Sequence, residues 1–321
     1  MAPDTVGDAQ PVHAERKQAK QSAYVGRFAP SPTGPLHFGS LITALASYLD
    51  ARANRGRWLV RIEDIDPPRE EAGAAESILI SLRDHGLHWD GDPLYQSTRF
   101  EVYQRTADEL IGRHQAYFCT CSRSQLAGHS VYPGHCRSHF TQPSTPYAVR
   151  LLVPAEAIEF DDAIQGHCCE WLQRSVGDFI IFRKERLPAY QLAVVIDDAA
   201  EGVTHIVRGC DLLDNTARQI HLQRCLNLPT PRYAHIPVIA NPLLQKLSKQ
   251  TFARAIDPAR AHQNVRAALE FLGQPVPASA ACNSVAELLR YAVEHWSLSK
   301  IPHTRVLSGD QLPESCRGYA T

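Results

Sequence analysis

"RFAPSPTGPLHFGS", residues 27–40, contains three prolines and two glycines, so it cannot form a helix or a long strand. Such a loop between a strand and a helix binds phosphate when the backbone allows close approach and free N–H groups face the ligand. Gly34 and Gly39 would permit this approach, and His37 and Ser40 could donate hydrogen bonds. The same composition also fits a proline-rich connector with a surface histidine.

Strand and helix signals alternate through the residues on either side of this loop. Apolar positions 41, 42, 45, 46 and 49 have helical spacing, and the run RWLVRIEDID reads as a buried strand that ends in carboxylates. The predicted elements are a strand at YVGRFAP (24–30), a helix at 39–55, a strand at 57–66, helices at 69–86 and 99–114, and a strand at AYFCTC (116–121). This order predicts an α/β, Rossmann-like parallel sheet that binds nucleotide at the carboxyl ends of its strands.

The pattern changes after this first unit and then returns. The runs YAVRLLVP, DFIIFRK and QLAVVIDD indicate a β-rich insertion, after which VTHIVRG and YAHIPVI read as strands on either side of a helix at 212–226. We therefore expect a flexible tail (1–22), the first half of the catalytic domain (23–115), an insertion of the acceptor-binding type (116–190), the second half of the catalytic domain (191–255) and a small helical C-terminal region (256–321).

The composition is that of a globular protein. The 321 residues are 44% hydrophobic and 21% charged, and they contain neither an apolar run of membrane-spanning length nor the apolar core of a secretory signal. We therefore expect a cytoplasmic protein that makes no contact with a membrane. The net charge of −1 provides no general attraction to nucleic acid, although residues 216–266 are rich in arginine and lysine. That basic block fits either a solvated face or a site for a polyanion.

Three of the nine cysteines cluster in the insertion. Cys119 and Cys121 are one residue apart and Cys136 follows 15 residues later, which suggests a metal site more than disulfides in a reducing compartment. Three thiolates need a fourth ligand for tetrahedral zinc, and His129, His135 and His139 are nearby competitors for that place. Reduced thiols without a metal are the alternative.

The opening stretch resembles the first signature of the glutamyl-type class I aminoacyl-tRNA synthetases. LHFGS would be their HIGH motif, with Ser40 in place of the final histidine. Three further segments match in the family's order: RIEDID (61–66), YQLAVVIDDAAEGVTHIVRGCDLL (190–213) and KLSKQ (246–250), the last in place of KMSKS. The resemblance covers about residues 24–255.

The resemblance implies activation of glutamate by ATP with Mg²⁺. His37, Ser40 and the backbone at Gly39 would then hold the triphosphate, and Lys246 and Lys249 would neutralise charge on the departing phosphates. Little acid–base chemistry is needed, because positioning and charge neutralisation carry this reaction.

The resemblance also assigns residues to glutamate and to zinc. Two guanidiniums would bind the carboxylates of glutamate and an acid would bind its ammonium. The matched positions are Arg27 and Arg208 for the guanidiniums, Glu63 for the acid, Tyr190 as a hydrogen-bond partner, and Phe28, Ala29, Pro30 and Ser31 as loop contacts. An ordinary ion pair between Arg27 and Glu63 is the alternative. One structural Zn²⁺ would be bound by Cys119, Cys121, Tyr132 and Cys136.

The length of the chain after KLSKQ points to one subgroup. Only about 70 residues follow that motif, whereas a full glutamyl-tRNA synthetase carries a large anticodon-binding region there. The chain therefore resembles the truncated glutamyl-queuosine tRNA(Asp) synthetases, which implies transfer of glutamate to queuosine in the anticodon arm of tRNA(Asp), by a monomer. The alternatives are a minimal synthetase that charges a tRNA 3′ end and a non-catalytic paralogue that binds glutamate or ATP.

Overall fold

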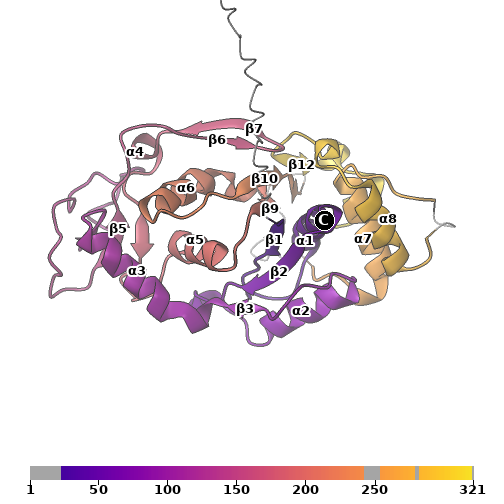
Figure 1. Ribbon diagram of the computed structural model, residues 1–321, viewed down its shortest axis with the longest axis horizontal. Coiled ribbons are helices and arrows are strands. Elements are labelled where there is room, and N and C mark those ends of the chain that lie inside the picture. The colour runs from indigo at the N-terminus through magenta and orange to yellow at the C-terminus, as the bar shows by residue number, and fades with distance from the viewer. Residues whose placement is uncertain (1–22, 242–253, 279–281, 320–321) are drawn as a thin grey trace, which may run out of the picture.

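The centre of the fold is a parallel β-sheet that continues across two hydrogen-bonded groups of strands. The computed structural model describes residues 23–241, 254–278 and 282–319. The first group has the order β1 (Val25–Phe28), β2 (Arg57–Ile62), β3 (Leu94–Tyr95), all parallel. The second has the order β7 (Gly166–Glu170), β6 (Ile158–Asp162), β10 (Arg232–Ile236), β9 (His205–Gly209), in which β7 is antiparallel to β6 and the other pairs are parallel. The N–H of Thr204 donates to the carbonyl of Val25, so β9 lies beside β1 (Figure 1).

Helices cover both faces of this sheet (Figure 1). One face carries α1 (Phe38–Ala53), α2 (Ala74–Asp84), α7 (Ala261–Phe271) and α8 (Val285–His295), and the other carries α3 (Phe100–Gly112), α5 (Tyr190–Ala200) and α6 (Thr216–Cys225). Helix α1 is central because Leu41, Leu45 and Leu49 repeat on one side and are fully buried. The expected α/β fold with a parallel sheet and small C-terminal helices is confirmed.

The prediction that AYFCTC adds a third parallel strand is wrong. This segment forms β4 (Ala116–Cys119), which pairs antiparallel with β5 (Ala148–Leu151), and β5 pairs antiparallel with β8 (Ile180–Phe182). The third parallel strand is the two-residue β3, which is too short to show an alternating pattern.

The β-rich interpretation of QLAVVIDD is also wrong, because this run lies within helix α5. Its residues 191–198 are all buried, and a helix buried on all sides gives an apolar run that cannot be told from a buried strand. The two aspartates at the end of the run, Asp197 and Asp198, are buried in hydrogen bonds to neighbouring elements.

The segments around the second sheet complete the fold. The predicted strand YAHIPVI is two strands, because Pro237 has no N–H to donate between β10 and β11 (Val238–Ala240). Strand β11 pairs with β12 (Val306–Ser308), and α4 (Leu172–Ser175) and α9 (Glu314–Arg317) are single turns. Within the described residues no helix has the length and apolar character that crossing a membrane requires.

Candidate active site

A cavity of about 860 Å³ opens where β1, β2 and β9 end and α1 begins. Such a place, at the carboxyl ends of parallel strands and the positive end of a helix, suits an anionic ligand. The structure brings most of the predicted site residues to its wall: Arg27, Phe28, Ala29, Pro30, Ser31, His37, Gly39, Ser40, Glu63, Tyr190 and Arg208. Lys246 and Lys249 lie outside the described residues.

The LHFGS segment forms the N-terminus of α1. His37 is the N-cap, and its Nδ1 accepts a hydrogen bond from the N–H of Ser40 at 3.3 Å. A neutral imidazole then carries its hydrogen on Nε2, which lies 3.0 Å from the Ser40 hydroxyl oxygen. The Ser40 hydroxyl can therefore accept from His37 and donate its own hydrogen to a ligand oxygen.

Gly39 lies where this turn packs closely against the His37 ring and strand β11. A Cβ atom there would lie 3.3 Å from the His37 ring and 3.4 Å from Cγ2 of Ile239. A larger residue at position 39 would therefore require the His37 ring or Ile239 to shift by a few tenths of an ångström.

The residues on either side of the KLSKQ region also reach this pocket. Val238 lines it, and beyond residues 242–253 Ala255 forms an antiparallel bridge with His37. The N–H of Ile256 donates to the carbonyl of Leu36 at 3.0 Å. The sequence signature at 27–40 and the segment that follows the lysine motif are therefore in contact.

Arg27 is held by a buried aspartate and not by Glu63. Its Nε donates to Oδ1 of Asp198 at 3.0 Å and its Nη2 to Oδ2 at 3.4 Å. Arg61 donates to the same Asp198 and also to Glu201, at 2.8 and 2.6 Å. The alternative of an ordinary ion pair between Arg27 and Glu63 is therefore wrong, and Arg27 belongs to a network with Asp198 that sequence reasoning missed.

Glu63 reaches the same pocket from β2. It is 8% exposed, and its Oε1 lies 3.8 Å from Nη2 of Arg61. Burial raises the pKa of the Glu63 carboxyl to about 7, although Arg61 and Arg27 act in the opposite direction. A carboxyl in this state gains charge readily when a cationic ligand arrives.

In the part of the chain that the structure describes, Arg208 on β9 has one guanidinium nitrogen without a hydrogen-bond partner. Its Nε donates to Nε2 of His235 at 2.9 Å, and its Nη2 donates to the Thr216 hydroxyl at 2.9 Å and to the Leu212 carbonyl at 3.4 Å. Its Nη1 is buried and, among the described residues, has no hydrogen-bond partner. A buried donor of this kind suits a carboxylate or phosphate oxygen in the pocket that Arg208 lines.

Tyr190 is the first residue of α5 and closes the pocket next to these charges. Burial raises the pKa of its hydroxyl, while the charge of Arg208 lowers it. The hydroxyl therefore stays protonated and can donate to an anionic ligand.

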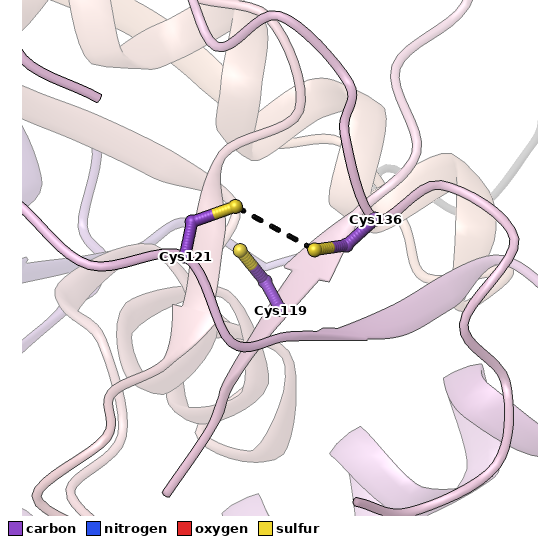
Figure 2. Close-up of side chains that lie close together, drawn as sticks. All are labelled: Cys119, Cys121 and Cys136. Carbon is purple, nitrogen blue, oxygen red and sulfur yellow. Dashed lines mark hydrogen bonds between the residues drawn. The ribbon is translucent and has the colours of Figure 1, made fainter. Parts of the chain in front are cut away.

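The cysteine cluster lies away from this pocket, at the end of β4. Figure 2 shows the side chains of Cys119, Cys121 and Cys136 turned toward one another, and their sulfur atoms all lie within 4.8 Å of one another. The hydroxyl of Tyr132 is 3.5 Å from Sγ of Cys119 and 3.8 Å from Sγ of Cys121. No histidine nitrogen joins this group in the part of the chain that the structure describes.

Two cations hold the cluster in place. The guanidinium of Arg150 lies 3.7 Å from the centre of the Tyr132 ring and donates to Sγ of Cys119 at 3.3 Å. Burial raises the pKa of Cys119, but hydrogen bonds from Tyr132 and Arg150 lower it by more than burial raises it. The pKa of Cys119 is therefore below that of a free thiol. Lys184 donates to the carbonyls of Thr120 and Cys121, both at 2.8 Å.

The described residues of the basic block lie on more than one part of the surface. Arg232 begins β10 and lines a second hollow beside Tyr24 and His205, so it lies at the opposite end of its strand from the pocket. Arg218 is half-buried and donates to Asn215 on its own helix terminus, whereas Arg254 and Arg260 are exposed on the side where Ala255 meets His37.

Comparison with known proteins gives consistent results. The family model for the catalytic domain of class I tRNA synthetases (E and Q) matches residues 24–270. A protein of Pseudomonas aeruginosa named glutamyl-Q tRNA(Asp) synthetase is 49% identical over 294 residues, which are 91% of this chain and 99% of the relative. A protein of the same name from Thiobacillus denitrificans is 50% identical over 288 residues, which are 88% of this chain and 96% of the relative.

Solved structures of longer enzymes share the fold. The glutamate–tRNA synthetase of Elizabethkingia anophelis superposes with a TM-score of 0.74 at 25% identity, covering 90% of this chain and 69% of the longer one. A glutamate–tRNA ligase of Elizabethkingia meningosepticum in complex with its amino acid gives a TM-score of 0.72 at 26% identity, covering 88% and 66%.

Proposed function

We propose that this chain, which belongs to the class I tRNA synthetases of the glutamyl and glutaminyl type, activates glutamate with ATP. It would then transfer the glutamate to queuosine in the anticodon of tRNA(Asp). As a member of this family it is a ligase-type enzyme that acts on glutamate, ATP and tRNA. The observation that carries the choice of glutamate is the convergence of Arg27, Arg208 and Glu63 on one cavity. Two guanidiniums and one acid match the two carboxylates and one ammonium of the substrate.

In the first step, an oxygen of the α-carboxylate of glutamate attacks the α-phosphorus of ATP. The bond to the β-phosphate oxygen breaks, which yields glutamyl-adenylate and pyrophosphate. ATP enters as its Mg²⁺ complex, as in the family. The N-terminus of α1 with Gly39, the Ser40 hydroxyl and His37 would bind phosphate oxygens, and Lys246 and Lys249 would stabilise the leaving pyrophosphate.

In the second step, a hydroxyl of the queuosine side chain attacks the activated carbonyl and AMP leaves. The support for this acceptor is that the named glutamyl-Q tRNA(Asp) relatives align over almost their whole length with this chain.

The deciding experiment supplies the enzyme with ATP, labelled glutamate and tRNA(Asp) with or without queuosine. We expect label only on the queuosine-bearing tRNA, in a bond that survives removal of the tRNA 3′ end. Label on the 3′ end of tRNA(Glu) would instead indicate a minimal glutamyl-tRNA synthetase. Absence of both label and glutamate-dependent ATP–pyrophosphate exchange would indicate a non-catalytic paralogue.

The affinity for glutamate should depend on pH through Glu63. Below its pKa of about 7 this carboxyl is neutral and must lose a proton before it can pair with the substrate ammonium. We therefore expect the Kd of glutamate, measured by calorimetry, to fall as pH rises from about 5.5 to 7 and to level off above that, approaching a tenfold change per pH unit at the acidic end. Glu63→Gln should bind glutamate weakly and without this pH dependence; a Kd in this variant that still follows pH would contradict the assignment.

We also infer that the cysteine cluster binds one structural Zn²⁺. This ion fits a site of three thiols whose sulfur atoms lie within 4.8 Å of one another, with the hydroxyl of Tyr132 as the fourth ligand. The guanidinium of Arg150 next to the Tyr132 ring would offset the negative charge of the thiolates. Cys119, Cys121, Cys136 and Tyr132 would bind it, and zinc would fix the β4–β5 region, which has only a small core of its own.

Removing one zinc ligand should lower both zinc affinity and stability. Tyr132→Phe is expected to weaken zinc binding in competition with a chromogenic chelator, whereas His135→Ala should leave it unchanged. At free zinc 100 times its Kd the bound ion contributes about 2.7 kcal/mol to the free energy of unfolding, so the loss is measurable by denaturation. If His135→Ala and not Tyr132→Phe loses zinc, the fourth ligand is the histidine.

A further inference from the structure

The side chain of Arg208 is supported by a buried pair that neither sequence motif contains. Asp162 is the last residue of β6, and its Oδ1 accepts three backbone N–H groups, those of Ile164, Gln165 and His235, at 3.0, 2.9 and 3.0 Å. Its Oδ2 lies 2.6 Å from Nδ1 of His235. Both side chains are completely buried.

Hydrogen bonding decides the protonation state of His235. An arginine Nε–H can only donate, so Nε2 of His235, 2.9 Å from Nε of Arg208, must be an unprotonated acceptor. The ring therefore carries its hydrogen on Nδ1 and donates it to Asp162. Burial lowers the pKa of His235 to about 4, which agrees with a neutral ring.

The scaffold occupies one whole edge of the Arg208 guanidinium. Nε is bound by His235 and Nη2 by Thr216 and Leu212, so Nη1 is the nitrogen left for a ligand. Arg208 lines the pocket, and a rotation of its guanidinium would change the direction in which Nη1 can donate. The orientation of this donor depends on the acceptor at Nε2 of His235.

We propose that Asp162 and His235 are positioning residues for substrate recognition: Asp162 fixes the Nδ1–H tautomer of His235, and His235 orients Arg208 so that Nη1 meets a carboxylate of glutamate. This inference rests on the proposed function, because it takes glutamate as the ligand. The inference gives Asp162, a residue of the β6–β7 hairpin, a role in the site where glutamate would be activated.

Two kinds of variant test the chain of contacts. His235→Leu removes the acceptor, while His235→Gln retains a side-chain oxygen that can accept from Arg208. Asp162→Asn retains an oxygen for the backbone N–H groups but places either two donors at Nδ1 or, if the ring changes tautomer, two donors at Nε2. Asp162→Asn and His235→Leu should therefore act in the same direction.

The measurement is ATP–pyrophosphate exchange, with KM determined separately for glutamate and for ATP and folding checked by thermal unfolding. We expect His235→Leu and Asp162→Asn to raise the KM of glutamate about 10- to 100-fold and to leave the KM of ATP unchanged. His235→Gln should recover a large part of the loss. Combining His235→Leu with Arg208→Lys should give little more loss than Arg208→Lys alone, because both changes act on one contact.

Each other outcome overturns the inference. A parallel rise in both KM values would show a general structural role, and additive effects with Arg208→Lys would show that His235 does not act through Arg208. If Asp162→Asn and His235→Leu fail to fold, His235→Gln carries the test, and a glutamate KM raised about 100-fold in this folded variant, which keeps an acceptor for Arg208, would refute the inference. Failure of the wild-type enzyme to exchange pyrophosphate with glutamate would refute the proposed function instead.

Discussion

Arg208→Lys should lower kcat/KM for glutamate in ATP–pyrophosphate exchange by about 100- to 1,000-fold. Lysine keeps the positive charge but has a single nitrogen, so it cannot donate to His235, to Thr216 and to the substrate at once. Each hydrogen bond to a charged group contributes about 1.5–3 kcal/mol, so the loss of one to two such bonds accounts for the expected range. Initial rates over a range of glutamate concentrations measure the effect.

The structure changes the reason for this expectation. An arginine can bind a carboxylate through two nitrogens of its guanidinium, but here the structure commits Nε and Nη2 to His235 and Thr216, and among the described residues only Nη1 has no partner. Arg113→Lys, in a surface pair with Glu109 on α3, is the matched control and should change kcat/KM by less than about two-fold. An unchanged glutamate kcat/KM in Arg208→Lys would exclude this arginine from substrate binding.

Asp198→Asn should lower the free energy of unfolding by about 3–5 kcal/mol. This carboxylate accepts hydrogen bonds from both Arg27 and Arg61. All three side chains are almost completely buried. An amide of the same shape would leave the two guanidiniums with less negative charge in a place that water does not reach. Denaturant unfolding at pH 7 measures the loss.

The effect of Asp198→Asn should also depend on pH. Burial raises the pKa of Asp198, but Arg27 and Arg61 lower it more, so its folded-state pKa is below the ordinary value. Its contribution is therefore complete above the ordinary pKa of an aspartate and disappears as pH falls through the lowered one, where variant and wild type should converge. Asp161→Asn, on a side chain 89% exposed, is the control and should change stability by less than about 0.5 kcal/mol. Equal losses in the two variants would mean that the buried network does not stabilise the fold.

The sequence predicts those parts of the site whose functional residues lie close together along the chain. The loop at 27–40 combines backbone demands, a helix cap and phosphate donors within a few positions, so its location between a strand and a helix follows from local rules. The placing of Arg27, Glu63 and Arg208 at strand ends follows in the same way, because parallel strands bring their carboxyl ends together.

The residues that were missed are buried polar partners joined across long stretches of chain. Asp198 lies 171 positions from Arg27, and Asp162 lies 73 positions from His235. No periodicity marks such pairs, because each member stands alone in an apolar or loop segment. The prediction that QLAVVIDD is a strand is wrong for a related reason. A helix that is buried on all sides lacks the polar face by which its sequence pattern differs from that of a strand.

The pairing of β6 with β10 limits how far this enzyme can be treated as a set of exchangeable modules. The hairpin β6–β7 lies in the insertion by sequence, yet it hydrogen-bonds to the sheet of the second half and supplies Asp162 beneath the pocket. A chimaera that replaces residues 116–190 with a foreign acceptor-binding segment would have to graft this strand in register. The part of the insertion that carries Cys119, Cys121 and Cys136 is therefore freer to vary than its base, where Asp162 supports Arg208 through His235.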